Sequence, residues 1–326
     1  MLKIKDNIFS VTDSTFQAIA LQVFQMQYEG VEVYQRFCQS LKATPSSVKR
    51  LADIPFLPVE FFKSYEVIMM GQTTETIFES SGTTGSIPSR HYVTDLKVYE
   101  RSFLKGFEHF YGSPEDYVIL GLLPSYLERN NSSLVYMVNR LVQLSGKKES
   151  GFFLHEHEAL ANLLLQLKER KQNTILIGVT FGLLDFVEEY KIDFPDLIVM
   201  ETGGMKGRRE ELLREEVHEK LCKGFGVKKI HSEYGMTELL SQGYSKGDGI
   251  FETPPWLKIF TRDLYDPLKV LEKGRSGAIN IIDLANINSC SFIATNDIGG
   301  INADGTFQII GRMDNAEIRG CNLMVV

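Results

Sequence analysis

Residues 117–123 read YVILGLL and residues 174–179 read TILIGV, and these two stretches decide the fold class of the chain. Each is a short, nearly continuous apolar run, which is typical of a β-strand buried on both faces of a sheet. Sequence with apolar residues at helical spacing follows them, at residues 133–144, 158–170 and 183–190. Strands that alternate with helices predict βαβ units, a mostly parallel sheet and helices on both of its faces.

Outside these stretches the pattern continues in both directions. Asp13 is a suitable N-cap for a first helix, and residues 31–41 predict a second one. Further strands are expected at residues 151–154, 197–200 and 228–231, and a highly charged helix at residues 208–222.

The character of the sequence changes after about Pro254. Short β-like runs, punctuated by Gly and Asn, replace the helical spacing at residues 257–260, 278–284, 292–295 and 306–310. We therefore expect an N-terminal helical segment and an α/β core over residues 1–253. A small, mostly antiparallel β subdomain should follow over residues 254–326.

Composition narrows the class of protein. The 326 residues carry a formal net charge of -7, which argues against nucleic acid as the main partner because phosphate binding needs a basic surface. No stretch approaches the roughly 20 apolar residues of a membrane span, and no signal-peptide pattern opens the sequence. The four cysteines, Cys38, Cys222, Cys290 and Cys321, are far apart, so we expect reduced thiols and a cytoplasmic protein.

The first motif is SSGTTGS at residues 80–86. Two glycines let the backbone turn several N–H groups toward one point, and the hydroxyls add donors for phosphate oxygens. A Ser/Gly loop without a ligand is the alternative. The P-loop pattern GxxxxGK[ST] is absent from the chain.

The second motif, HSEYGMTE at residues 231–238, follows a predicted strand. Ligands of open α/β sheets lie at the carboxyl ends of strands. There Tyr234 offers a flat face to a base, Thr237 a hydroxyl to a phosphate and Glu238 a hard oxygen to Mg²⁺. A helix N-cap with its first turn is the alternative for the Thr-Glu pair.

Two shorter motifs lie further along the chain. TNDIG at residues 295–299 follows a β run, and its Asp297 is suited to ribose hydroxyls, although an Asp-containing turn is the simpler interpretation. GRMD at residues 311–314 offers Arg312 to a nucleotide, and a surface hairpin is its alternative.

The order and spacing of these four motifs resemble the adenylate-forming superfamily of acyl-CoA synthetases, adenylation domains and luciferases. Within it, the chain looks closest to phenylacetate–CoA ligases and to acyl-protein synthetases of the LuxE type. The stretches IPFLPVEFFKS, LLPSYLERNNSSLVYM and ETGGMKGRRE, at residues 54–64, 122–137 and 201–210, resemble signatures of the LuxE type. The resemblance covers essentially the whole chain.

The resemblance implies ATP and Mg²⁺ as cofactors, with the small β subdomain completing the nucleotide site. It matches Ser81, Gly82, Thr83, Thr84 and Gly85 to the loop that holds the β- and γ-phosphates, and Gly203, Gly204 and Tyr234 to the adenine pocket. It matches Thr237 to the residue near the α-phosphate, Glu238 to the Mg²⁺ ligand, Asp297 to the ribose-binding aspartate and Arg312 to the arginine that follows it.

The chain also departs from the family pattern. The basic residue expected soon after the phosphate loop has only Arg90 as a candidate. Larger relatives continue into a mobile second domain with a catalytic lysine, which we expect this chain to lack. LuxE-type proteins instead offer a C-terminal cysteine as acyl acceptor, and Cys321 lies near the end of this sequence. An incidental free thiol is the alternative.

Three hypotheses follow. The first is a ligase that converts a fatty or aryl acid to acyl-AMP and passes the acyl group to Cys321 and then to a partner protein. The second is an adenylating core that hands acyl-AMP to CoA or to a carrier protein. The third, of another class, is a non-catalytic module that binds a nucleotide or an acyl group. The walls of the acid pocket are expected at residues 124–127, 179–183 and 239–243.

Overall fold

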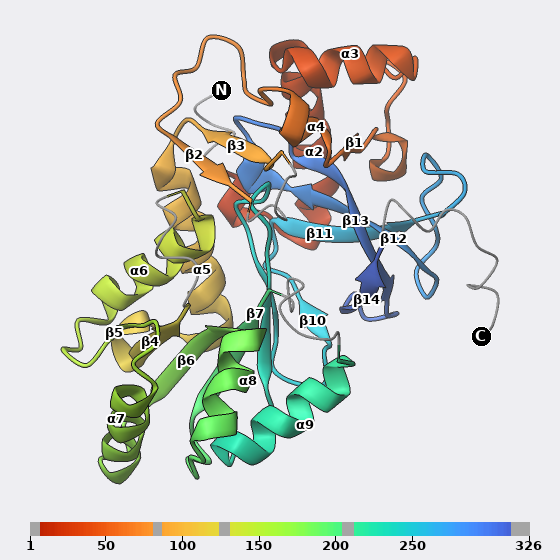
Figure 1. The fold of residues 1–326 in the computed structure, drawn as a ribbon. Coiled ribbons are helices and arrows are strands. Elements are labelled where there is room, and N and C mark those ends of the chain that lie inside the picture. Colours follow the sequence, from red (N-terminus) through yellow and green to blue (C-terminus); the bar gives the residue numbers. More distant parts are fainter. Residues whose placement is uncertain (1–6, 81–86, 124–130, 204–211, 314–326) are drawn as a thin grey trace.

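The structure, a computed structural model, describes residues 7–80, 87–123, 131–203 and 212–313. Five parallel strands form one half of its main sheet, in the order β5-β4-β6-β7-β8 (Figure 1). The sequence prediction of buried parallel strands is confirmed, because β4 and β6 are buried along their whole length. The bounds of these strands are β4 Val118–Leu122, β5 Gly151–Phe153, β6 Thr174–Val179, β7 Ile198–Thr202 and β8 His231–Tyr234.

Helices cover both faces of this half. Their ends follow local rules: the Ser132 hydroxyl caps α6, and Gly146 ends it in the left-handed conformation at φ 62°. Side chains of α8 and α9 contact Glu201 on one face, whereas Tyr111 of α5 contacts His231, whose side chain points to the other face. The helices are α5 Leu96–Tyr111, α6 Ser133–Ser145, α7 His157–Glu169, α8 Thr180–Glu189 and α9 Arg214–Phe225.

The antiparallel half continues the same sheet. Strand β9 pairs with β8 in the antiparallel sense, and the order then runs β9-β10-β14-β13-β12-β11. The predicted antiparallel C-terminal region is thus confirmed, with its pairing beginning at Gly243. The division into two domains at residue 253 stays a prediction. The bounds are β9 Gly243–Ser245, β10 Phe251–Glu252, β11 Leu257–Arg262, β12 Ser276–Asp283, β13 Phe292–Ile301 and β14 Phe307–Arg312.

The N-terminal segment packs against the antiparallel half. The buried amide of Gln27 hydrogen-bonds to the backbone of Asn286 and Ser291, and Phe24 and Tyr34 pack on Phe292 of β13. Strand β1 (Leu57–Pro58) pairs with β13, while β2 and β3 form a separate hairpin. These elements are α2 Asp13–Gly30, α3 Glu32–Ser40, α4 Phe61–Ser64, β2 Thr76–Glu79 and β3 Arg90–Val93, and the short 3₁₀ helices are η1 Ile8–Ser10, η2 Leu51–Asp53, η3 Pro114–Asp116 and η4 Leu284–Asn286.

Several predicted boundaries differ from the structure. The charged helix expected at residues 208–222 covers Arg214–Phe225, because the Leu213 N–H is capped by the Glu216 carboxylate and Leu212 and Leu213 lie before the helix. The strand expected at residues 228–231 begins only at His231, because its register is set by pairing with Met200 of β7 and not by the apolar Ile230 before it. Asp297 does not follow a strand but lies inside β13, which extends beyond Thr295 because β14 pairs with its second half.

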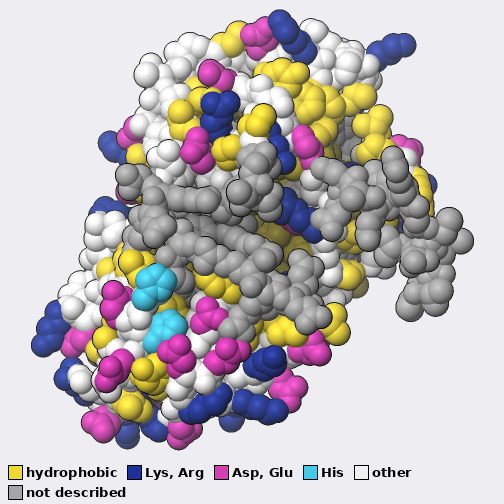
Figure 2. Space-filling model, in the orientation of Figure 1, with side chains coloured by type: hydrophobic (Ala, Val, Ile, Leu, Met, Phe, Trp, Pro, Cys, Tyr) yellow, Lys and Arg dark blue, Asp and Glu magenta, His cyan; other side chains and the backbone are white. Residues whose placement is uncertain are grey.

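Two broader expectations can be compared with the surface and the helices. No helix within the described ranges is long and apolar enough to cross a membrane. On the face in Figure 2, Lys and Arg side chains alternate with Asp and Glu, and no large basic patch is visible among the described atoms. That nucleic acid is not the main partner stays a prediction.

Candidate functional site

Three of the predicted nucleotide-site residues come together from three strands. Tyr234 ends β8, and its hydroxyl donates to Asp297 Oδ2 of β13 at 2.7 Å. Arg312 of β14 is the register partner of Asp297, and its Nε lies 3.9 Å from Asp297 Oδ1. Burial, together with the charge of Asp297, raises the pKa of Tyr234 well above its usual value, so its hydroxyl remains a donor.

The segment after β8 carries Thr237 and Glu238. The Thr237 carbonyl is 2.9 Å from Nδ1 of His91, and the Glu238 carbonyl accepts from Asn286 Nδ2 at 2.7 Å. Burial lowers the pKa of His91 to about 4, so its ring is neutral and Nδ1 carries the proton for this bond. Both contacts fix the backbone, so they orient the side chains of Thr237 and Glu238.

The Glu238 carboxyl is 5% exposed. Burial raises its pKa, while a hydrogen bond from Ser89 and the charges of Arg312 and Lys63 act in the opposite direction. Burial disfavours the negative charge of a carboxylate, so a carboxyl in this position is stabilised by binding a cation or a proton.

The β2–β3 hairpin brings the residues on either side of the predicted phosphate loop to this place. The Ser80 N–H donates to the Ser89 carbonyl, and the Ser89 N–H donates to Ser80 Oγ at 2.9 Å. Because Ser89 also contacts Glu238, both ends of the loop are held beside this carboxyl. Arg90 is exposed at the start of β3, opposite Glu79. The loop residues Ser81, Gly82, Thr83, Thr84 and Gly85 lie outside the described residues.

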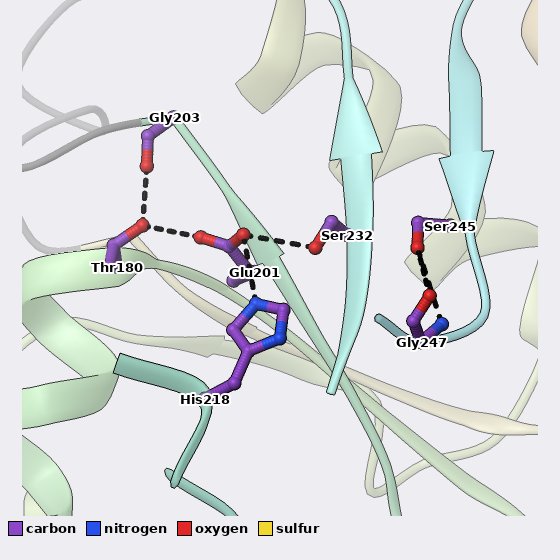
Figure 3. A network of polar contacts seen from close by, with 7 residues as sticks. All are labelled: Thr180, Glu201, Gly203, His218, Ser232, Ser245 and Gly247. Carbon is purple, nitrogen blue, oxygen red and sulfur yellow. Dashed lines mark hydrogen bonds and ion pairs between the residues drawn. The ribbon is translucent and has the colours of Figure 1, made fainter. Parts of the chain in front are cut away.

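A second polar network holds the end of β7 (Figure 3). Thr180 Oγ1 lies 2.7 Å from Glu201 Oε2 and 2.5 Å from the Gly203 carbonyl oxygen, and its one proton can be donated to either acceptor. Ser232 Oγ donates to Glu201 Oε1 at 2.9 Å, and His218 Nε2 is 3.4 Å from the same oxygen. The network joins α8, α9, β7 and β8 to Gly203, the one residue of the predicted glycine pair that is described.

The charge on Glu201 is stabilised by these partners. Burial by itself raises its pKa, but the hydrogen bonds from His218 and Thr180 and the charge of Arg214 together lower the pKa below its usual value. The sequence analysis did not select Glu201 or His218, and it included Thr180 only within a predicted wall of the acid pocket. The signal was a carboxylate near the end of an apolar strand, two residues before Gly203.

Glu233 points to the opposite face of the sheet. It accepts a short hydrogen bond of 2.5 Å from Thr202, its register partner. The pKa of Glu233 is raised to about 7, mainly by burial. The hydrogen bond from Thr202 lowers this pKa, and the negative charge of Glu201 raises it further. The site therefore contains one carboxyl that stays ionised, Glu201, and one that titrates near neutral pH, Glu233.

Two buried charged residues of the antiparallel half support the site from behind, and the sequence analysis missed both. Asp283 accepts four hydrogen bonds, from the backbone of Leu240, Ser241 and Ala285 and from the Ser241 hydroxyl, at 2.6–3.0 Å. Arg262 donates to the carbonyls of Ile279 and Thr295 and to the Asn280 side chain. Asp283 thereby fixes the chain just after Glu238, and Arg262 fixes β13 beside Asp297.

The remaining predicted residues divide into two groups. Gly204 and Cys321 lie outside the described residues. Burial raises the pKa of the other three cysteines, Cys38, Cys222 and Cys290, and that of Cys38 reaches about 12. Among the described residues, no group of three or more His, Cys, Asp or Glu side chains could hold a metal ion.

The geometry can now be compared with known proteins. The sequence profile of the family described as "Acyl-protein synthetase, LuxE" matches residues 9–326. The chain belongs to this family. A comparison with curated protein sequences gives no match.

Solved structures of ligases share the fold of this LuxE-family protein. ATP-bound MatB from Rhodopseudomonas palustris aligns with 85% of the chain and 56% of its own length, at 17% identity and a TM-score of 0.56. An open conformation of 2-hydroxyisobutyryl-CoA ligase aligns with 95% of the chain and 78% of its own, at 14% identity and a TM-score of 0.66. A long-chain-fatty-acid-CoA ligase from Archaeoglobus fulgidus aligns with 74% of the chain and 52% of its own length, at 18% identity and a TM-score of 0.51. The chain thus spans only about half the length of MatB and of the Archaeoglobus ligase.

Proposed function

We propose that this LuxE-family protein is an ATP-dependent ligase that activates a fatty or aryl acid as acyl-AMP and transfers the acyl group to a thiol. The observation that carries the proposal is the joining of Tyr234, Asp297 and Arg312 beside Glu238. Two structural neighbours lend support from the shared fold: MatB was solved with ATP, and 2-hydroxyisobutyryl-CoA ligase with 2-HIB-AMP and CoA.

In this proposal the nucleotide lies across the carboxyl ends of β7 and β8. Tyr234 and Gly203, with Gly204, face the adenine, and Asp297 and Arg312 bind the ribose hydroxyls. Residues 81–85 and Arg90 bind the β- and γ-phosphates, and Thr237 the α-phosphate. Donors of these kinds suit a charged ligand, because hydroxyl, N–H and guanidinium groups stabilise phosphate charge most when they are placed before the ligand binds.

Glu238 is the residue that would hold Mg²⁺, which would neutralise phosphate charge when bound. A single protein carboxylate fits this ion, since Mg²⁺ usually keeps several waters and shares its shell with phosphate oxygens. The raised pKa of buried Glu238 is consistent with a carboxyl whose charge is meant to be compensated.

The proposed chemistry has two steps. A carboxylate oxygen of the acid attacks the α-phosphorus of ATP, and the bond to the bridging oxygen breaks, which releases pyrophosphate and leaves acyl-AMP. Two anions must approach each other, so positioning and charge neutralisation supply most of the rate.

In the second step a thiolate attacks the acyl carbon of acyl-AMP, and AMP leaves with the electron pair of the broken C–O bond. The thiol must first lose its proton. We assign this role to Cys321, because burial disfavours the thiolate of the other three cysteines. The thioester would then pass its acyl group to an acceptor protein. A cytoplasmic location would supply both ATP and reduced thiols.

Intact-mass measurement tests this proposal. The purified protein is incubated with ATP, Mg²⁺ and a panel of aliphatic and aryl acids, with the Cys321→Ser variant as control. We expect an ATP-dependent acyl adduct that hydroxylamine removes and that the variant lacks. Turnover by the variant when CoA or a carrier protein is supplied would instead favour the adenylating core. Binding of ATP without pyrophosphate release for any acid would favour the non-catalytic module.

A further inference from the structure

A small cavity lies between the start of α5 and the η4 loop, and Leu240, two residues after Glu238, is part of its lining. Its volume is about 10 Å³, and its lining includes Thr94, Asn286 and Asn288. This volume is close to the minimum that one water molecule requires. The lining of the cavity comes from β3, α5, the segment around η4 and Leu240, and it includes none of the residues assigned to the nucleotide.

Each of these three residues has a buried oxygen without a partner among the described residues. The atoms are Thr94 Oγ1, Asn286 Oδ1 and Asn288 Oδ1. Burying a polar atom without a hydrogen bond is costly, and such atoms are rare in folded proteins. Three of them around one cavity therefore indicate a shared partner.

The donors and acceptors of this cavity match a water molecule. Asn286 Nδ2 donates to the carbonyls of Glu238 and Cys290, so the orientation of its amide is determined and Oδ1 is the free acceptor. Two amide oxygens need donors, and the Thr94 hydroxyl can donate or accept. One water can donate to both amide oxygens and accept from Thr94, which satisfies all three residues.

We propose that a structural water molecule binds in this cavity and links Thr94 to Asn286 and Asn288. Through Asn286 the water supports the Glu238 carbonyl, so Thr94 and Asn288 act as positioning residues for the segment that carries Glu238. The effect on nucleotide binding rests on the proposed function. The water itself does not depend on it.

A crystal structure at atomic resolution tests the water directly. We expect one oxygen peak within hydrogen-bond distance of all three orphaned atoms. A second crystal soaked in a thallium(I) salt tests for a monovalent cation, which the same oxygens could also bind. An anomalous thallium peak in the cavity, or an empty cavity, would overturn the proposal.

A pair of valine variants tests the energetics without any assay of activity. Thr94→Val keeps the shape of the side chain but removes one partner of the water, so we expect the unfolding midpoint to fall by a few degrees. Thr261→Val is the matched control, because Thr261 Oγ1 is also buried without a described partner but Thr261 is not part of the lining of this cavity. We expect this control to be neutral or stabilised. Equal changes in the unfolding midpoints of the two variants would contradict the proposed water molecule.

Nucleotide binding then tests the link to Glu238. With Mg²⁺ and ATP as the probe, we expect Thr94→Val to raise the Kd about 3- to 10-fold, and Thr94→Ser, which retains the hydroxyl, to stay within about twofold of the wild type. An unchanged Kd for Thr94→Val would remove the positioning role. If the wild type itself does not bind ATP, the proposed function fails. The crystal structure and the unfolding midpoints still test whether the water molecule is bound.

Discussion

The parallel half of the sheet and the antiparallel half bury different kinds of side chain. In β4 and β6, apart from Thr174 at the start of β6, the residues are apolar or glycine, and all of them are buried. The antiparallel half buries Arg262, Asn280, Asp283 and Thr295 within or at the ends of its strands. The first half is stabilised mainly by apolar burial, the second to a larger degree by hydrogen bonds.

The difference shows how the two halves serve the site. In the parallel half, polar groups such as Glu201 gather where strands end, and the apolar interior only supports them. In the antiparallel half, the polar interior itself reaches the site: Asp283 binds the chain after Glu238, and Arg262 lies behind Asp297. Substitutions should therefore separate stability from activity in one half and couple them in the other.

The largest effect is expected at the site itself. Glu238→Gln removes the proposed Mg²⁺ ligand, so we expect pyrophosphate release to fall about 100- to 1,000-fold, or about 3–4 kcal/mol. The unfolding transition should stay near that of the wild type, because the amide replaces a carboxyl whose charge is disfavoured by burial. Full activity in this variant would remove Glu238 from the proposal.

Next comes the apolar interior of the parallel half. Leu176 is fully buried in β6, and Leu176→Ala should lower the free energy of unfolding by about 3 kcal/mol through lost burial and a cavity. Activity per folded molecule should be retained at low temperature. A loss of activity as large as the loss of stability would break the contrast between the halves. Urea unfolding and pyrophosphate release measure the two quantities.

Asp283→Asn is the counterpart in the antiparallel half. The amide group turns one acceptor into a donor that faces backbone N–H groups, so we expect about 2 kcal/mol less stability. Because the segment after Glu238 loses its anchor, activity should fall about tenfold as well, even where the variant is fully folded. Normal activity in the folded variant would show that Asp283 only stabilises the fold.

Glu233 gives a prediction in pH. Burial raises its pKa in the folded state to about 7, from a usual value of 4.5. Its contribution to stability is therefore fully present below about pH 4.5 and is lost as the pH rises through about 7. We expect the wild type to lose about 2 kcal/mol relative to Glu233→Gln between pH 5 and pH 8. A difference in stability that does not vary with pH would contradict the raised pKa.

The smallest effect is expected for the contact between the two halves. Tyr234→Phe removes the hydrogen bond from β8 to Asp297 of β13 and leaves the ring in place. We expect a loss of about 1 kcal/mol, measured as an approximately fivefold higher Kd for ATP in calorimetry. Asp297→Asn, which keeps an acceptor for Tyr234, separates this bond from the charge of Asp297. A Kd for Tyr234→Phe equal to that of the wild type would show that the bond does not shape the nucleotide site.

The sequence by itself determined the local elements and the residue types of the site. Apolar runs at β4 and β6 predict buried strands because a strand interior excludes polar groups, whatever the rest of the chain does. Tyr234, Glu238, Asp297 and Arg312 were selected from motifs, and the structure places Tyr234, Asp297 and Arg312 in contact. Their roles remain predictions.

Only the tertiary structure decided which residues support them. His91 binds the Thr237 carbonyl, Asn286 binds the Glu238 carbonyl, and Asp283 binds the N–H groups of Leu240 and Ser241. The two residues of each pair are 42–146 positions apart along the chain. A side chain that binds a distant backbone group leaves no periodic pattern, because the backbone atoms that it meets are the same for every residue type. The position of Asp297 inside β13 follows the same reason, since the pairing with β14 extends the strand beyond the point where its own apolar run ends.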